Sequence, residues 1–206
     1  MRQGPEEAGP QPSGPAVDRE PLKTGRLVLQ PVDPSLAGAI WEASRASLAA
    51  LQPWLAWAAT ASLDQTRAFT EEAVRNWEAG TDFSFAILEG DEVVGAAGCH
   101  RAMLARPMGE IGYWLRTGRT GRGYATEAAG AVVRWSFDVL GFARLELRAG
   151  VDNVPSQRVA ERLGFRREGR LRRGCPHPHG GYDCYIYGLL PEDVPGPQDE
   201  GPPEPT

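Results

Sequence analysis

The stretch that decides the fold is Gly118-Arg119-Thr120-Gly121-Arg122-Gly123-Tyr124-Ala125-Thr126-Glu127-Ala128, which lies directly after the run Glu110-Ile111-Gly112-Tyr113-Trp114-Leu115. The run predicts a strand and the glycines predict a turn. Small and apolar residues then recur at spacings of three and four from Ala125 to Leu140, which predicts a helix with one buried face. A helix that begins in a glycine-rich loop presents unpaired backbone N–H groups, so the sequence predicts a phosphate site here.

Chain length and composition favour one folded domain. The 206 residues suffice for one good-sized core, and no internal repeat is visible. Residues 1–21 and 191–206 are rich in Pro, Gly and Glu and nearly lack apolar residues. We therefore expect two disordered tails around a single folded domain at residues 22–190.

Charge and cysteine content exclude several classes of protein. The net charge of −5 argues against a nucleic-acid-binding surface over the whole chain. No apolar run reaches the length of a membrane span, and the N-terminus lacks the apolar region of a secretion signal. The three cysteines, Cys99, Cys175 and Cys184, are too few for a disulfide framework. We expect a cytoplasmic protein without membrane or nucleic-acid partners.

Hydrophobic patterning predicts an α+β domain around one mixed sheet. The expected strands are 26–30, 83–88, 93–95, 109–116, 145–148, 165–173 and 182–189. The expected helices begin at Asp33, at Asp64, at Ala125 and at Ser156. The helix from Asp64, its expected N-cap, is expected to end at Gly80 and to bury Phe69, Ala73, Val74 and Trp77.

Several motifs in a fixed order resemble the GNAT superfamily of acyl-CoA-dependent N-acetyltransferases, most closely its ribosomal-protein alanine acetyltransferase (RimJ/RimL-like) branch. The matching segments are 24–29, 53–57, 110–115, 121–128 and 153–165. The resemblance implies the GNAT fold, with a mixed, mostly antiparallel central sheet of about seven strands and helices on both faces. It also implies acetyl-CoA as cosubstrate and no metal.

The resemblance places the coenzyme. The family's pyrophosphate loop reads Gln/Arg-x-x-Gly-x-Gly/Ala, which falls here on Thr120, Gly123 and Ala125. Thr120 departs from this pattern and brings no charge, so we expect Arg119 or Arg122 to supply it. Dinucleotide and P-loop patterns fit this loop less well. The implied coenzyme-binding residues are Tyr113, Trp114, Leu115, Thr120, Gly121, Arg122, Gly123, Tyr124, Ala125, Thr126, Asn153 and Ser156.

The resemblance also assigns catalytic roles. Glu110 occupies the position of a glutamate base, and its alternative role is a solvent-facing strand carboxylate. Many members protonate the thiolate with a tyrosine seven residues after the position of Asn153, where this chain has Ala160. Ser156 is the expected substitute, unless it is an ordinary helix cap. Asn153 is expected to bond the pantetheine amide, or else to be a turn residue.

The resemblance implies that the acceptor is an amine, but it does not specify which kind. An α-amine loses its proton at a cost of about 1–1.4 kcal/mol at pH 7, against roughly 4–5 for lysine, so a weak base favours a protein or peptide N-terminus. Trp54 and Trp57 are expected to wall the acceptor site, with core packing as the alternative, and Asp183 to recognise the amine. Two alternative functions stay open, namely a small-molecule or antibiotic amine acetyltransferase and a non-catalytic acyl-CoA sensor. A homodimer also stays open as the oligomeric state.

Two further patterns suggest a metal site and a DNA-binding helix, and neither is supported by its spacing. Cys175, His177, His179 and Cys184 combine metal-ligating residue types, but their spacing matches no usual zinc pattern. A run of arginines between Arg158 and Arg173 invites a DNA-binding interpretation, but the glycines within it indicate a helix followed by a strand. A few of these arginines are expected to meet the 3′-phosphate of coenzyme A.

Overall fold

A computed structural model describes residues 17–103, 107–178 and 180–196. The tails expected to be disordered therefore fall mostly outside the described residues. At both ends, the described chain packs beyond residues 22–190. Val17 and Val194 contact the core, and the Trp77 indole donates a hydrogen bond to the Val17 carbonyl at 2.8 Å.

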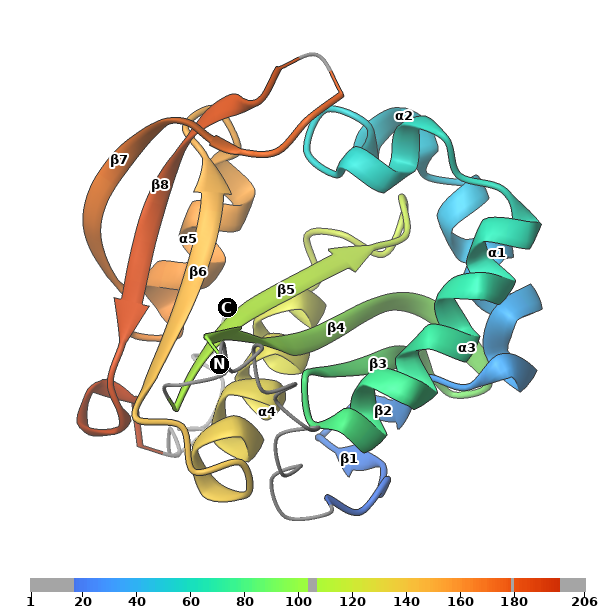
Figure 1. The fold of residues 1–206 in the computed structure, drawn as a ribbon, viewed down its shortest axis with the longest axis horizontal. Helices are drawn as coiled ribbons and strands as arrows, with labels where there is room; N and C mark the ends of the chain where they lie inside the picture. Colours follow the sequence, from blue (N-terminus) through green and yellow to red (C-terminus); the bar gives the residue numbers. More distant parts are fainter. Residues whose placement is uncertain (1–16, 104–106, 179, 197–206) are drawn as a thin grey trace, which may run out of the picture.

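The described chain forms one eight-stranded sheet with helices on both faces (Figure 1). The helices are α1 (Ala37–Arg45), α2 (Leu48–Leu51), α3 (Leu63–Ala79), α4 (Tyr124–Asp138) and α5 (Val154–Arg162), with short 3₁₀ turns η1 (Pro34–Leu36), η2 (Ala56–Ala59) and η3 (Pro191–Asp193). The strands are β1 (Leu22–Lys23), β2 (Val28–Pro31), β3 (Asp82–Glu89), β4 (Glu92–Met103), β5 (Met108–Leu115), β6 (Arg144–Gly150), β7 (Arg166–Cys175) and β8 (Tyr182–Leu189).

The sheet confirms the predicted α+β class. Its strand order is β1-β2-β3-β4-β5-β6-β8-β7, and every neighbouring pair is antiparallel except β5 with β6. The eighth strand, missed in the sequence, is the two-residue β1, which folds back onto β2. A strand this short carries no alternation of apolar and polar residues by which to find it.

Successive residues of each strand pack against helices on opposite faces. Phe85 and Ile111 belong to the larger core, which α4 completes with Ala128 and Val132. Ala86 belongs to a second cluster with residues of α1 and α3, namely Ile40, Ala43 and Ala73. The alternation at Phe85 and Ala86 therefore accounts for the helices on both faces (Figure 1).

Helix α3 differs in detail from its prediction. Its N-cap is Ser62, whose hydroxyl accepts a hydrogen bond from the Gln65 N–H at 3.2 Å, and not Asp64. Its buried residues are Thr70, Ala73 and Trp77, at a spacing of three and four. Phe69 lies beside that stripe and is 40% exposed, and Val74 is only half-buried. The helical period selects Thr70 over Phe69 because burial follows the helix face and not hydrophobicity alone.

Strands β5 and β6 separate soon after they meet. They pair in parallel only at Met108–Arg144, Gly109–Leu145 and Glu110–Glu146. Beyond Glu110, β5 continues along β4 while β6 continues along β8, so the two strands diverge in a V (Figure 1). The facing edges of Ile111–Leu115 and Leu147–Gly150 are therefore left without a strand partner.

Candidate active site

A cavity of about 950 Å³ occupies the opening between β5 and β6. It collects most of the residues that the sequence singled out, from segments far apart in the chain. These are Trp54, Trp57, Glu110, Tyr113, Trp114, Leu115, Thr120, Gly121, Gly123, Tyr124, Ala125, Thr126, Asn153 and Ser156. Two predicted residues, Arg122 and Asp183, are not among the described residues that line it.

The glycine-rich loop adopts a conformation that its sequence requires. Gly118, Gly121 and Gly123 have φ angles of +88°, +77° and +81°, a region that side chains with a Cβ rarely adopt. Gly123 is the N-cap of α4 and has no side chain with which to cap it. The backbone N–H groups of the first turn are therefore left for a ligand at the cavity wall, where an anion is favoured.

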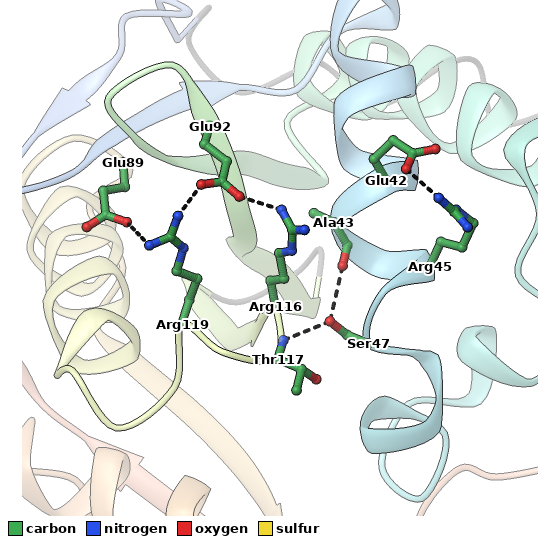
Figure 2. A network of polar contacts seen from close by, with 9 residues as sticks. All are labelled: Glu42, Ala43, Arg45, Ser47, Glu89, Glu92, Arg116, Thr117 and Arg119. Carbon is green, nitrogen blue, oxygen red and sulfur yellow. Dashed lines mark hydrogen bonds and ion pairs between the residues drawn. The ribbon is translucent and has the colours of Figure 1, made fainter.

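The first half of the loop is tied to two neighbouring elements (Figure 2). Arg119 forms ion pairs with Glu89, at 3.0 Å, and with Glu92. Arg116 pairs with the same Glu92. Two carboxylates of the β3–β4 hairpin thus hold the guanidinium of Arg119, one of the two arginines expected to supply charge to the coenzyme, and Arg119 is not among the described residues that line the cavity.

A buried serine holds the loop from the other side. The Ser47 hydroxyl accepts a hydrogen bond from the Thr117 N–H at 2.8 Å and donates one to the Ala43 carbonyl at 3.1 Å (Figure 2). Ser47 lies between α1 and α2 and is almost fully buried. It therefore links the first helices to the start of the glycine-rich loop.

Glu110 lies at the point where β5 and β6 separate. Its side chain is 33% exposed, and its carboxylate lies 3.6 Å from the Arg148 guanidinium on β6. Because the side chain lines the cavity, it is neither buried in the core nor directed wholly to solvent. The sequence missed Arg148, whose role depends on the pairing of two strands distant in the chain.

Ser156 meets a second hydroxyl. The Tyr113 phenol oxygen lies 2.9 Å from the Ser156 hydroxyl oxygen, and it also donates to the Ser156 carbonyl at 3.3 Å. Burial raises the pKa of Tyr113 to about 12, against the opposing effect of the hydrogen bond with Ser156. At neutral pH the phenol is therefore protonated, and the pair can donate one hydrogen bond to a group in the cavity.

Asn153 takes the role of a helix cap. Its side-chain oxygen accepts a hydrogen bond from the Ser156 N–H at 3.3 Å at the start of α5. Ser156 is thus not the cap, and the helix begins two residues before the predicted position. Asn153 still lines the cavity beside the space expected for pantetheine.

The aromatic segment around Trp54 is joined to the β7–β8 hairpin over the cavity. The Tyr182 hydroxyl donates to the Trp54 carbonyl at 2.8 Å, and their rings meet edge to face at 5.9 Å. His177 makes a second link to the Gln52 carbonyl at 3.0 Å. Trp57 packs on Trp114 of β5 at 5.8 Å. Tyr182 had no signal in the sequence, since its partner lies far away in the chain.

Asp183, which was expected to recognise the amine, is not among the described residues that line the cavity. The backbone N–H of Arg173 and the Arg170 guanidinium bond its carboxylate at 2.9 and 2.8 Å, and these contacts lower the pKa of Asp183. The Asp183 carboxylate on β8 thus binds residues of β7 within the same hairpin. Arg158 and Arg162 of α5, from the arginine run, do line the cavity.

Within the part of the chain that the structure describes, no three His, Cys, Asp or Glu side chains are grouped to hold a metal. His179 lies outside that part. Among the described helices, none has the length and apolar character needed to cross a membrane.

Comparisons with known proteins agree with this geometry. The family described as acetyltransferase (GNAT) domain matches residues 26–166. The chain is 32% identical over 114 residues to an uncharacterized N-acetyltransferase, p20, of Bacillus licheniformis, covering 55% of this chain and 64% of that protein. It is 31% identical over 112 residues to the ribosomal-protein-serine acetyltransferase of Escherichia coli K12, covering 54% and 63%. The matches span 49–64% of the length of the first curated relatives.

Solved structures share the architecture. Mycobacterium smegmatis RimJ in complex with CoA-disulfide has a TM-score of 0.77 and 26% identity, over 86% of this chain and 88% of that one. At 86% of this chain, the structural similarity is longer than the segment 26–166 that the family comparison matches.

Proposed function

Because this chain belongs to the GNAT acetyltransferase family, we propose that it transfers an acetyl group from acetyl-CoA to the N-terminal amine of a protein or peptide. The observation that carries this proposal is the cavity in the β5–β6 opening, which has a carboxylate, a hydroxyl pair and a glycine-rich helix start on its walls. A relative's name as a ribosomal-protein acetyltransferase supports a protein acceptor.

The residues fit the coenzyme. The unpaired edge of β5 at Tyr113, Trp114 and Leu115 offers backbone groups along which the pantetheine arm can pair as an added strand. The pyrophosphate would lie on the N–H groups from Gly121 to Ala125. A Cβ at Gly121 would meet nothing within 4 Å, so this cradle is open. Arg158 and Arg162 would face the 3′-phosphate, where a fixed positive charge favours binding.

The reaction needs a neutral amine beside the thioester. Glu110 would accept the proton, directly or through water, as the amine attacks the thioester carbonyl carbon. As the carbon–sulfur bond breaks, the Ser156 hydroxyl, supported by Tyr113, would donate a hydrogen bond to the leaving sulfur. Because a thiol has a pKa near 8.5, the thiolate needs little more help to leave.

A thiol-release assay tests the function. Acetyl-CoA is offered with N-terminal peptides, lysine peptides, polyamines and aminoglycosides, and free coenzyme A is measured. We expect the fastest release with N-terminal peptides. Faster release with a polyamine or an aminoglycoside would favour the small-molecule alternative, and coenzyme binding without release by any amine would indicate a sensor.

Glu110→Gln tests the proposed base. The substitution keeps the shape of the side chain and removes its basicity, so turnover with peptides should fall about 100-fold or more, while coenzyme A binds as before. Glu42→Gln is the matched control, because Glu42 is an exposed carboxylate of α1 paired with Arg45 (Figure 2). Unchanged turnover in Glu110→Gln would exclude it as the base.

A further inference from the structure

Arg26 lies behind the glycine-rich loop and is bonded to it. Its Nη1 donates to the Arg122 carbonyl at 2.9 Å, and its guanidinium stacks on the Tyr124 ring at 4.7 Å. Its Nη2 is 3.4 Å from the position that a Cβ on Gly123 would take. Arg26 is not among the described residues that line the cavity, so it contacts the loop and not the space for the ligand.

Glu127 of α4 fixes Arg26 in this position. Its Oε2 accepts from Arg26 Nε at 2.8 Å and lies 2.6 Å from Nη2. Its Oε1 accepts from the Arg26 backbone N–H at 2.9 Å and from the Thr24 hydroxyl at 2.6 Å. Burial alone would raise the pKa of Glu127, but these hydrogen bonds outweigh burial and lower it.

Other residues of the loop do not take the place of the Arg26 contact. Thr120 brings no charge, Arg119 is held by Glu89 and Glu92, and Gly123 has no side chain to cap α4. Moreover, Glu127 lies in the first turn of a helix whose N-terminus would receive a phosphate. An unneutralised carboxylate there would repel the phosphate, and Arg26 neutralises it.

We propose that Arg26 is a positioning residue for coenzyme binding. Paired with Glu127, it holds the Arg122 carbonyl and thereby fixes the 121–125 backbone, and it offsets the negative charge of Glu127. This inference rests on the proposed function, since it assumes that the loop binds a pyrophosphate.

Two acetyl donors test it. Acetyl-CoA carries the pyrophosphate, whereas S-acetylpantetheine has the same thioester and pantetheine arm without it. In Arg26→Gln, the KM for acetyl-CoA should rise on the order of tenfold, with kcat nearly unchanged, since about 1.4 kcal/mol of charge-assisted bonding is lost. Turnover with S-acetylpantetheine should stay at the wild-type rate. Arg26→Lys should recover part of the affinity, because it keeps the charge but not the forked geometry.

Arg45→Gln is the matched control. Arg45 also pairs with a glutamate, Glu42, at 2.7 Å, but on the outer surface of α1 (Figure 2). Its KM for both donors should equal that of the wild type. If Arg26→Gln folds poorly, Arg26→Lys, which keeps the charge, should still bind coenzyme A more weakly than the wild type in calorimetry.

Wild-type affinity for acetyl-CoA in Arg26→Gln, or an equal loss with both donors, would overturn the inference. A wild-type chain that binds no coenzyme A in calorimetry would instead overturn the proposed function.

Discussion

The Tyr113 phenol oxygen lies 2.9 Å from the Ser156 hydroxyl oxygen, although the two residues are 43 positions apart in the chain. One comes from β5 and the other from the first turn of α5, and both line the cavity. The pair places a protonated phenol beside the serine that we propose as the partner of the leaving thiolate.

Removing either hydroxyl should slow the reaction to different extents. Ser156→Ala deletes the hydroxyl that we propose as the partner of the leaving sulfur, so kcat should fall about 10- to 100-fold, as for loss of about 1.4–2.7 kcal/mol of transition-state bonding. Tyr113→Phe should have a smaller effect of the same sign. Steady-state kinetics at saturating acetyl-CoA measure both. A kcat in Ser156→Ala equal to that of the wild type would leave water as the proton donor.

The raised pKa of Tyr113 predicts lower stability in alkali. The folded state holds the phenolic proton with a pKa of about 12, whereas in the unfolded chain the pKa is near 10. The protonated phenol therefore contributes its full stabilisation below pH 10, and the contribution is lost as the pH rises from 10 to 12. The loss amounts to about 2–3 kcal/mol.

Urea unfolding at pH 8 and at pH 11 measures the first half of this loss, about 1.4 kcal/mol. Tyr113→Phe has no proton to lose, so its free energy of unfolding should fall less than that of the wild type between the two values. An identical fall in both proteins would contradict the assignment.

Ser47→Ala should weaken both the fold and coenzyme binding. It leaves the part-buried Thr117 N–H without the Ser47 acceptor, which costs about 1–3 kcal/mol of unfolding free energy, and it frees the start of the loop. Ser44→Ala is the matched control, because that hydroxyl bonds only the Trp41 carbonyl of its own helix. Chemical denaturation and calorimetry with coenzyme A should separate the two variants, and equal affinities would contradict a role for Ser47 in the loop.

Arg158→Gln and Arg162→Gln should reveal which phosphate these side chains face. If they meet the 3′-phosphate, both substitutions weaken coenzyme A binding several-fold and leave dephospho-coenzyme A almost unaffected. The ratio of the two dissociation constants is the measurement. A loss that is the same for both ligands would place the arginines elsewhere along the coenzyme.

Local patterns in the sequence predicted much of the fold. The run into Leu115, the glycines at 118, 121 and 123 and the apolar face of α4 each depend on residues close in the chain, and the structure confirms all three. The same kind of pattern missed β1 and misplaced the N-cap of α3. Those errors arise because a two-residue strand and a choice between Ser62 and Asp64 leave almost no periodic signal.

The sequence by itself thus determined which segments form the loop, the strand beside it and the helix after it. This was possible because turn conformation and one-sided burial depend on residues that are close together in the chain. Only the tertiary structure decided what each polar side chain meets. In the folded chain, Arg119 pairs with Glu89 and Glu92. Asp183 pairs with Arg170, and Ser156 shares a hydrogen bond with Tyr113. The physical reason is that charges and hydroxyls bond whichever partner packing brings within about 3 Å, and that partner comes from another part of the chain.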